Sequence, residues 1–204
     1  MSFDQLPFNG FDVVLVAILA AGVYYGRRKG MSGELLGMAK WLAIIFGCAA
    51  LYMPIGAYFA DGSSLFSTLS CYLLAYVGLA LVILLIFAGI SRGLGGKLLG
   101  SDAFGGAEYY LGIGAGVVRC ACILLAGLAL LNARYFSPTE VKAMEKFQDD
   151  VYGSNFFPTL HSFQAYVFER SFMGPLIKEN LGFVLIKPTE PQVKELHQKE
   201  AKWQ

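Results

Sequence analysis

The stretch EYYLGIGAGVVRCACILLAGLALL, residues 108–131, decides the fold expected for this chain. It is long and apolar enough to cross a lipid bilayer as a helix, yet it carries Arg119 near its middle. At about 100° per residue, Glu108, Gly112, Gly116 and Arg119 fall within a stripe about 80° wide. An arginine that faces lipid costs roughly 3 kcal/mol on insertion scales, so this stripe is expected to face other protein. We predict that it forms the seam on which a helix bundle packs.

The rest of the chain supports a membrane protein. Hydrophobic residues make up 56% of the 204 residues, against roughly 45–50% in ordinary soluble chains, and they gather in four blocks. The expected fold class is an all-α membrane protein, with four transmembrane helices in a compact bundle over residues 1–134. The spans are predicted at about 11–27, 33–54, 65–90 and 107–131. The first block is short for a full crossing, so a re-entrant hairpin is the alternative there.

Charge and residue chemistry exclude several classes of function. The net charge of +1 gives no reason to expect a nucleic-acid partner. The four cysteines lie inside apolar blocks, where they are expected to pack as small apolar residues. The two histidines, His161 and His197, have no nearby set of metal ligands or nucleophiles. We therefore expect no catalytic residues, no bound metal, no cofactor and no enzymatic activity.

Loop charges predict the orientation in the membrane. Arg27, Arg28 and Lys29 follow the first block, and Arg92 and Lys97 follow the third, whereas the N-terminal segment carries only acidic residues. The positive-inside rule then places these two loops in the cytoplasm and both chain termini outside it. The basic residues 27–29 are expected to set this topology, and binding of lipid headgroups is their second candidate role.

Residues 135–204 are expected to form an amphipathic helical segment. Ser137, Pro138 and Glu140 have the spacing of an N-cap, a first-turn proline and a capping-box glutamate. A second amphipathic stretch covers residues 159–172. Both helices are too short to span, so they lie either on the membrane surface or against the bundle. From Lys187 onward the chain is charged and is predicted to be a mobile tail.

Arg119 needs a partner within the bundle. Glu108 is about 16 Å away along the same helix, too far for a direct bond. Glu34 opens the second block, where an acid also suits a helix N-terminus, and it is the predicted partner across the helices. The functional alternative is that Arg119 contacts a ligand or ion. Gly112 and Gly116 allow close helix approach, within one chain or between copies.

Two motifs together resemble the colicin V production protein (CvpA) family. The first lies between the first two spans and comprises Gly26, Arg27, Arg28, Gly30, Glu34 and Trp41. The second opens the fourth span and comprises Glu108, Tyr109, Gly112, Gly116 and Arg119. Tyr109 stands where the family usually has an arginine.

This resemblance implies a multi-pass protein of the bacterial cytoplasmic (inner) membrane. It would act as an accessory or scaffold factor in toxin (bacteriocin) production or export and in envelope homeostasis. Its expected partners are the lipid bilayer, other membrane proteins and further copies of itself. Some relatives resemble a four-span anchor joined to a trypsin-like protease, but no comparable nucleophile motif occurs here. The alternative is a small oligomeric transporter or channel that uses the Glu108/Arg119 face.

Overall fold

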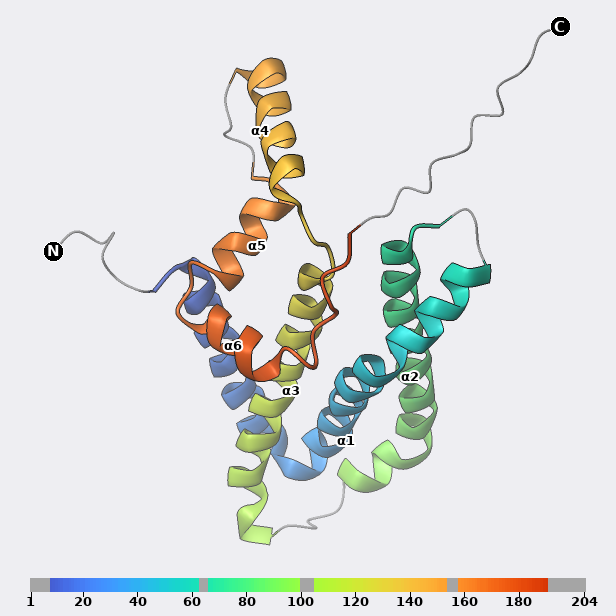
Figure 1. The fold of residues 1–204 in the computed structure, drawn as a ribbon. Coiled ribbons are helices and arrows are strands. Elements are labelled where there is room, and N and C mark those ends of the chain that lie inside the picture. The colour runs from blue at the N-terminus through green and yellow to red at the C-terminus, as the bar shows by residue number, and fades with distance from the viewer. Residues whose placement is uncertain (1–7, 63–65, 100–104, 154–157, 191–204) are drawn as a thin grey trace, which may run out of the picture.

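The computed structural model describes residues 8–62, 66–99, 105–153 and 158–190. Within these ranges the chain forms α1 (Gly10–Gly62), α2 (Thr68–Leu99), the short 3₁₀ helix η2 (Gly105–Ala107), α3 (Glu108–Asn132), α4 (Pro138–Tyr152), α5 (Leu160–Phe168) and α6 (Met173–Leu181). Figure 1 shows their arrangement. No β-strand occurs in the described ranges, so the predicted all-α class is confirmed.

In the described part of the chain, three helices are long and apolar enough to cross a membrane, where four were predicted. They are α1, α2 over Thr68–Gly93, and α3 together with η2 over Gly105–Asn132. The predicted spans 65–90 and 107–131 correspond to α2 and α3. The predicted spans 11–27 and 33–54 both lie in α1, on either side of a kink at Gly30, whose backbone is not helical. The basic residues 27–29, which were expected to form a loop, are helical up to that kink.

Gly30 bends α1. Its backbone has φ 70° and ψ 177°, a conformation that is essentially restricted to glycine. It divides α1 into a first leg, residues 10–29, and a second leg, residues 31–62. At about 1.5 Å per residue these legs are about 30 and about 48 Å long. Figure 1 shows them diverging from the bend, with α3 beside the first leg and α2 beside the second.

Glycines allow the first leg of α1 and α3 to cross with their backbones in contact. A Cβ placed on Gly22 would lie 2.8 Å from the carbonyl oxygen of Gly116, and one placed on Gly26 would collide with that of Gly112. On the other side, a Cβ on Gly116 would lie 2.8 Å from the Cα of Gly26. Small residues that bring two backbones together are typical of packing between membrane helices.

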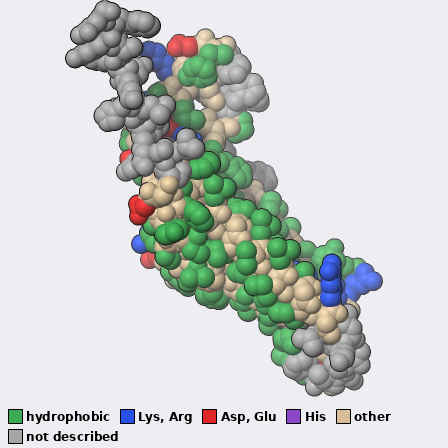
Figure 2. Space-filling model, turned by 90° about the vertical axis from the view of Figure 1, so that its right-hand side faces the viewer, with side chains coloured by type: hydrophobic (Ala, Val, Ile, Leu, Met, Phe, Trp, Pro, Cys, Tyr) green, Lys and Arg blue, Asp and Glu red, His purple; other side chains and the backbone are tan. Residues whose placement is uncertain are grey.

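The second leg of α1 packs against α2. The Cys48 thiol donates to the carbonyl oxygen of Tyr76 over 3.6 Å, and the Tyr52 ring packs edge-on against Tyr72 and Tyr76. The other side of α2 is apolar and uncovered, with Leu81 and Leu85 both more than half exposed. Figure 2 shows hydrophobic side chains covering this side of the molecule. Such a surface suits contact with lipid.

The polypeptide beyond α3 forms three short helices. The predicted cap of α4 is confirmed: Ser137 accepts a hydrogen bond from the Glu140 amide over 3.2 Å, and Pro138 opens the helix. The Glu140 carboxylate, however, pairs with Arg134. α4 extends away from the long helices, whereas α5 and α6 return to them (Figure 1). Part of the predicted charged tail, residues 191–204, lies outside the described residues.

Residues after α6 enter the helical body. Val184, Leu185 and Ile186 are buried, and Val184 packs with Ile45 of α1 and Cys122 of α3. Their non-helical backbone is held by side chains of the long helices. Asn132 Nδ2 donates to the carbonyl oxygen of Ile186 over 2.9 Å. Protein surrounds this non-helical backbone, which is the condition under which such backbone is tolerated within a membrane.

Candidate functional site: a charge cluster at the bend of α1

The predicted partners Glu34 and Arg119 lie together in the structure. Arg119 Nη1 of α3 is 3.1 Å from Glu34 Oε2, which lies one turn into the second leg of α1. The Glu34 side chain is 1% exposed and that of Arg119 is 19% exposed. Burial weakens the hydration of both charges, so each depends on the other. Gly37 keeps this space open, because a Cβ there would lie 3.4 Å from Arg119 Cδ.

Lys29 adds a second cation beside Glu34. Its Nζ lies 3.6 Å from Glu34 Oε1, whereas Arg119 contacts the other carboxylate oxygen, Oε2. The Lys29 side chain is 51% exposed, so solvent screens this pair and its contribution to stability is small, roughly 0–1 kcal/mol. The sequence predicted for Lys29 a role in topology or in binding lipid headgroups, and not an ion pair with Glu34. Its position just before the bend, five residues from Glu34, was the available clue.

Glu108 caps the second leg of α1 from a different helix. Its Oε1 accepts a hydrogen bond from the Ser32 amide over 2.6 Å. The first amides of a helix have no partner within it, and the helix dipole favours an anion there. Glu108 therefore provides the hydrogen-bond acceptor for the first turn of the second leg, which an N-cap side chain of the same helix normally provides. Sequence reasoning placed Glu108 on the stripe but assigned it no partner. We call Lys29, Glu34, Glu108 and Arg119 the charge cluster.

The charge cluster is balanced but incompletely hydrogen-bonded. It holds two cations and two anions, and both carboxylate oxygens of Glu34 interact only through ion pairs. Among the described residues, Glu108 Oε2 and Arg119 Nε also have no hydrogen-bond partner. Buried polar atoms of this kind usually hydrogen-bond to an ordered water. The arrangement can tie helices together or hold a few waters.

The site contains no constellation for metal or nucleophilic chemistry. In the described part of the chain, no group of three His, Cys, Asp or Glu side chains could hold a metal ion. All four cysteines are free and buried. The residues of the charge cluster interact through ion pairs and through the hydrogen bond of Glu108, which are electrostatic contacts.

The other basic residues at the bend point outward. Arg27 lies over the Tyr109 ring, with its Cζ 5.4 Å from the ring centroid, and Arg28 donates to the Tyr24 hydroxyl over 3.3 Å. Tyr109, the departure from the family pattern, thus contacts one of the basic residues of the first motif. The predicted orientation also rests on the charges of Asp4 and Lys97. Asp4 and the side chain of Lys97 lie outside the described part of the molecule.

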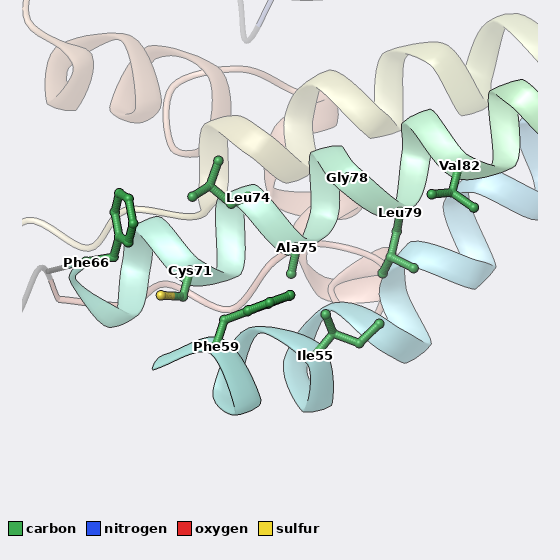
Figure 3. A pocket seen from close by; sticks show the side chains of 9 residues that line it. All are labelled: Ile55, Phe59, Phe66, Cys71, Leu74, Ala75, Gly78, Leu79 and Val82. Atoms are coloured by element: carbon green, nitrogen blue, oxygen red, sulfur yellow. The ribbon is translucent and has the colours of Figure 1, made fainter. Parts of the chain in front are cut away.

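A separate groove lies between the end of α1 and the start of α2. It has a volume of about 520 Å³, and Ile55, Phe59, Leu74 and Val82 are among the side chains that line it (Figure 3). The lining residues are apolar, with Cys71 the only titratable side chain among them. This groove offers room for hydrocarbon but no groups for chemistry.

Comparison with known protein families gives a match over most of the chain. The family described as Colicin V production protein matches residues 11–164, which covers all three long helices, α4 and the start of α5. No curated protein and no solved structure matches the chain.

Proposed function

Because the chain belongs to the colicin V production protein family, and is a membrane protein of that type, we propose that it serves as an accessory or scaffold factor. Its setting would be the bacterial cytoplasmic membrane, and its task would be toxin (bacteriocin) production or export together with envelope homeostasis. It would work without catalysis, through contacts with lipid, with other membrane proteins and with further copies of itself.

One observation carries this proposal: the intramembrane charges are occupied in holding helices together. Glu34 and Arg119 join α1 to α3, and Glu108 caps the bend of α1 from α3. A carrier or pore would be expected to present such charges to a water-filled path. Here the backbones of α1 and α3 are packed against each other through glycines.

The proposed topology has four crossings. Each leg of α1 is long enough to cross a hydrocarbon core of about 30 Å, as are α2 and α3. The basic residues 27–29 at the bend would then face the cytoplasm, with both termini on the other side. This orientation would place α4, α5 and α6 outside the cytoplasm, where α4 is available to a partner.

A small oligomeric transporter or channel is the second candidate. The buried atoms of Glu34, Glu108 and Arg119 that lack hydrogen-bond partners favour it, because they are the atoms that water or an ion would contact. Such a function would require a continuous aqueous path along the Glu108/Arg119 face.

Thiol accessibility separates these two functions. We suggest single cysteines at Glu108, Ala115 and Arg119 in a variant without the four native cysteines, probed in intact cells with a water-soluble maleimide. Gly112 and Gly116 are left unchanged because any Cβ there collides with α1. A scaffold predicts no labelling at Ala115 and Arg119, with exposed Asp61→Cys as the labelled reference. Labelling at both Ala115 and Arg119 would support the pore.

Partner capture tests the scaffold directly. A photo-crosslinking residue at Phe147, which is 64% exposed on α4, should give discrete adducts in native membranes. The same probe at Leu85, 72% exposed on the apolar side of α2, is the matched control and should give mainly lipid adducts. Absence of protein adducts from every exposed position of α4 would argue against a scaffold that works through this helix.

A further inference from the structure

A polar pocket lies where α3 ends, apart from the charge cluster at the bend. It has a volume of about 140 Å³ and is bounded by the segment after α3, by α5 and by α6. Its polar walls include Asn132, Arg134, His161, Gln164, Glu169 and Lys178. We propose that this pocket binds the headgroup of a phosphoethanolamine lipid, with the phosphate held by Arg134, His161 and Lys178. The proposal does not depend on the scaffold function.

Aromatic rings hold the two cations and the histidine at the pocket. The Arg134 guanidinium lies over the Phe136 ring, 4.5 Å from its centroid, and the His161 ring packs edge-on against Phe136 at 5.6 Å. Lys178 Nζ lies 5.8 Å from the centroid of Phe168. Cation–π contacts restrict the position of a charged group while leaving its N–H donors available. Three elements thus direct basic groups to one small space.

Arg134 has an N–H donor that the protein does not use. One edge of the guanidinium pairs with Glu140, but Nε is buried and has no hydrogen-bond partner among the described residues. A buried donor without an acceptor destabilises a protein, so an acceptor from outside is expected there. A phosphate oxygen would provide it, and arginine suits phosphate because its donors match two oxygens.

The amide side chains at the pocket have structural tasks. Gln164 donates to the carbonyl oxygens of Leu131 and Arg134, and Asn132 donates to that of Ile186. These bonds tie α5 and the segment after α6 to the end of α3. They fix the shape of the pocket and leave the basic groups to bind the ligand.

The location and size fit a lipid headgroup. Asn132 is the last residue of α3, a helix of membrane-crossing length, so the pocket lies near the level of lipid phosphates. Its volume equals that of about five water molecules, at about 30 Å³ each. That space admits the phosphate and amine of a headgroup, with the acyl chains remaining outside along the apolar helices.

Glu169 selects the headgroup. Glu169 is one of the residues that line the same pocket, and among the described residues no ion pair joins it to Arg134 or Lys178. An exposed carboxylate beside a phosphate site repels a second anion and attracts an ammonium group. The phosphate of a zwitterionic headgroup pairs with the basic groups while its ammonium pairs with Glu169. An anionic headgroup or free phosphate pairs with the basic groups alone.

Lipid titration of the full-length chain in a neutral detergent tests the proposal. The probe is dihexanoyl phosphatidylethanolamine, and the readout is the lipid concentration that gives a half-maximal rise in Tm. Lys178→Gln should raise this concentration about tenfold, because one charge-assisted hydrogen bond is lost. Lys146→Gln removes the same charge from α4 and should change nothing. Lys178 is exposed, so its variant is expected to keep the Tm of the lipid-free protein.

Further ligands and a further variant decide between the sources of phosphate. Dihexanoyl phosphatidylglycerol and inorganic phosphate should bind at least about tenfold more weakly than the ethanolamine lipid. Glu169→Gln should abolish the preference between the two lipids. Equal responses of the Lys178 and Lys146 variants would overturn the proposal. So would a preference for phosphatidylglycerol, or full competition by inorganic phosphate at the same concentration as the lipid.

Discussion

Glu34 carries a buried negative charge that depends on nearby cations. Its carboxylate is 1% exposed, and its interactions are the ion pairs with Arg119 and Lys29. It also lies in the first turns of the second leg, where the helix dipole favours an anion. The pairing with Arg119 was predictable because an arginine within an apolar stretch requires an acid. The contributions of Lys29 and Glu108 were not predictable, because they depend on how sharply α1 bends.

Removal of Arg119 tests the electrostatic role of the pair. Arg119→Gln leaves Glu34 buried beside an exposed lysine, so we expect a loss of stability of about 3–5 kcal/mol. Adding Glu34→Gln should recover a large part of that loss, because no unpaired buried charge remains. Thermal unfolding in detergent measures both, and Arg170→Gln, at an exposed position, is the control. Strictly additive effects of the two substitutions would show that the pair is not coupled.

Among the secondary-structure elements, α1 departs most from its prediction. Two spans were expected because residues 27–33 contain three basic residues and two glycines. The structure continues the helix through them and concentrates the turn at Gly30. A basic segment between apolar blocks resembles a loop in sequence whether or not its backbone stays helical. The distinguishing feature, one glycine with positive φ, has no local signature in a chain with 24 glycines.

Gly30→Ala tests the bend. Its φ of 70° with ψ of 177° is essentially a glycine conformation, and a Cβ there would lie 2.8 Å from the Glu108 carboxylate. We expect a loss of stability of roughly 1–3 kcal/mol, measured by thermal unfolding. Gly89→Ala in α2, where a Cβ meets nothing within 4 Å, is the matched control and should be neutral or stabilising. A neutral Gly30→Ala would mean that the bend does not require this conformation.

The crossing of α1 and α3 can be tested with two glycines of the same helix. Gly116→Ala forces a Cβ against the backbone of α1, and we expect it to destabilise the protein by about 1–3 kcal/mol. Gly114→Ala, two residues away, meets nothing within 4 Å. It should be neutral or slightly stabilising because alanine favours the helix. Resistance to unfolding by a denaturing detergent compares the pair, and equal behaviour would contradict close packing at Gly116.

At the scale of the whole molecule, the unexpected contacts join distant parts of the chain. Asp12 accepts hydrogen bonds from the amides of Phe172 and Met173, each over 3.0 Å, and so holds the start of α6 against the start of α1.

The long helices and both short amphipathic helices could be predicted from the sequence, because hydrophobic periodicity is a local property. The buried run Val184–Ile186 could not, because three apolar residues carry no periodicity and their partners lie far away in the sequence.

Asp12→Ala tests this long-range attachment. It leaves the part-buried amides of Phe172 and Met173, at the start of α6, without acceptors, which costs at most about 1–3 kcal/mol for each group. The effect should be local, so residues 173–187 should exchange amide hydrogens at least about tenfold faster while α3 stays protected. Asp61→Ala, at the exposed end of α1, is the control. Uniformly faster exchange throughout α3 would instead show that the attachment stabilises the entire bundle.

The attachment at Asp12 also bears on the order of events during synthesis. Phe172 follows Asp12 by 160 positions, and at about 5–20 residues per second a ribosome needs roughly ten to thirty seconds to cover that distance. When α3 has been synthesised, Ile45 and Cys122 still lack the apolar neighbour that Val184 will provide. A nascent chain arrested before residue 172 therefore differs from a finished one by an uncovered apolar surface.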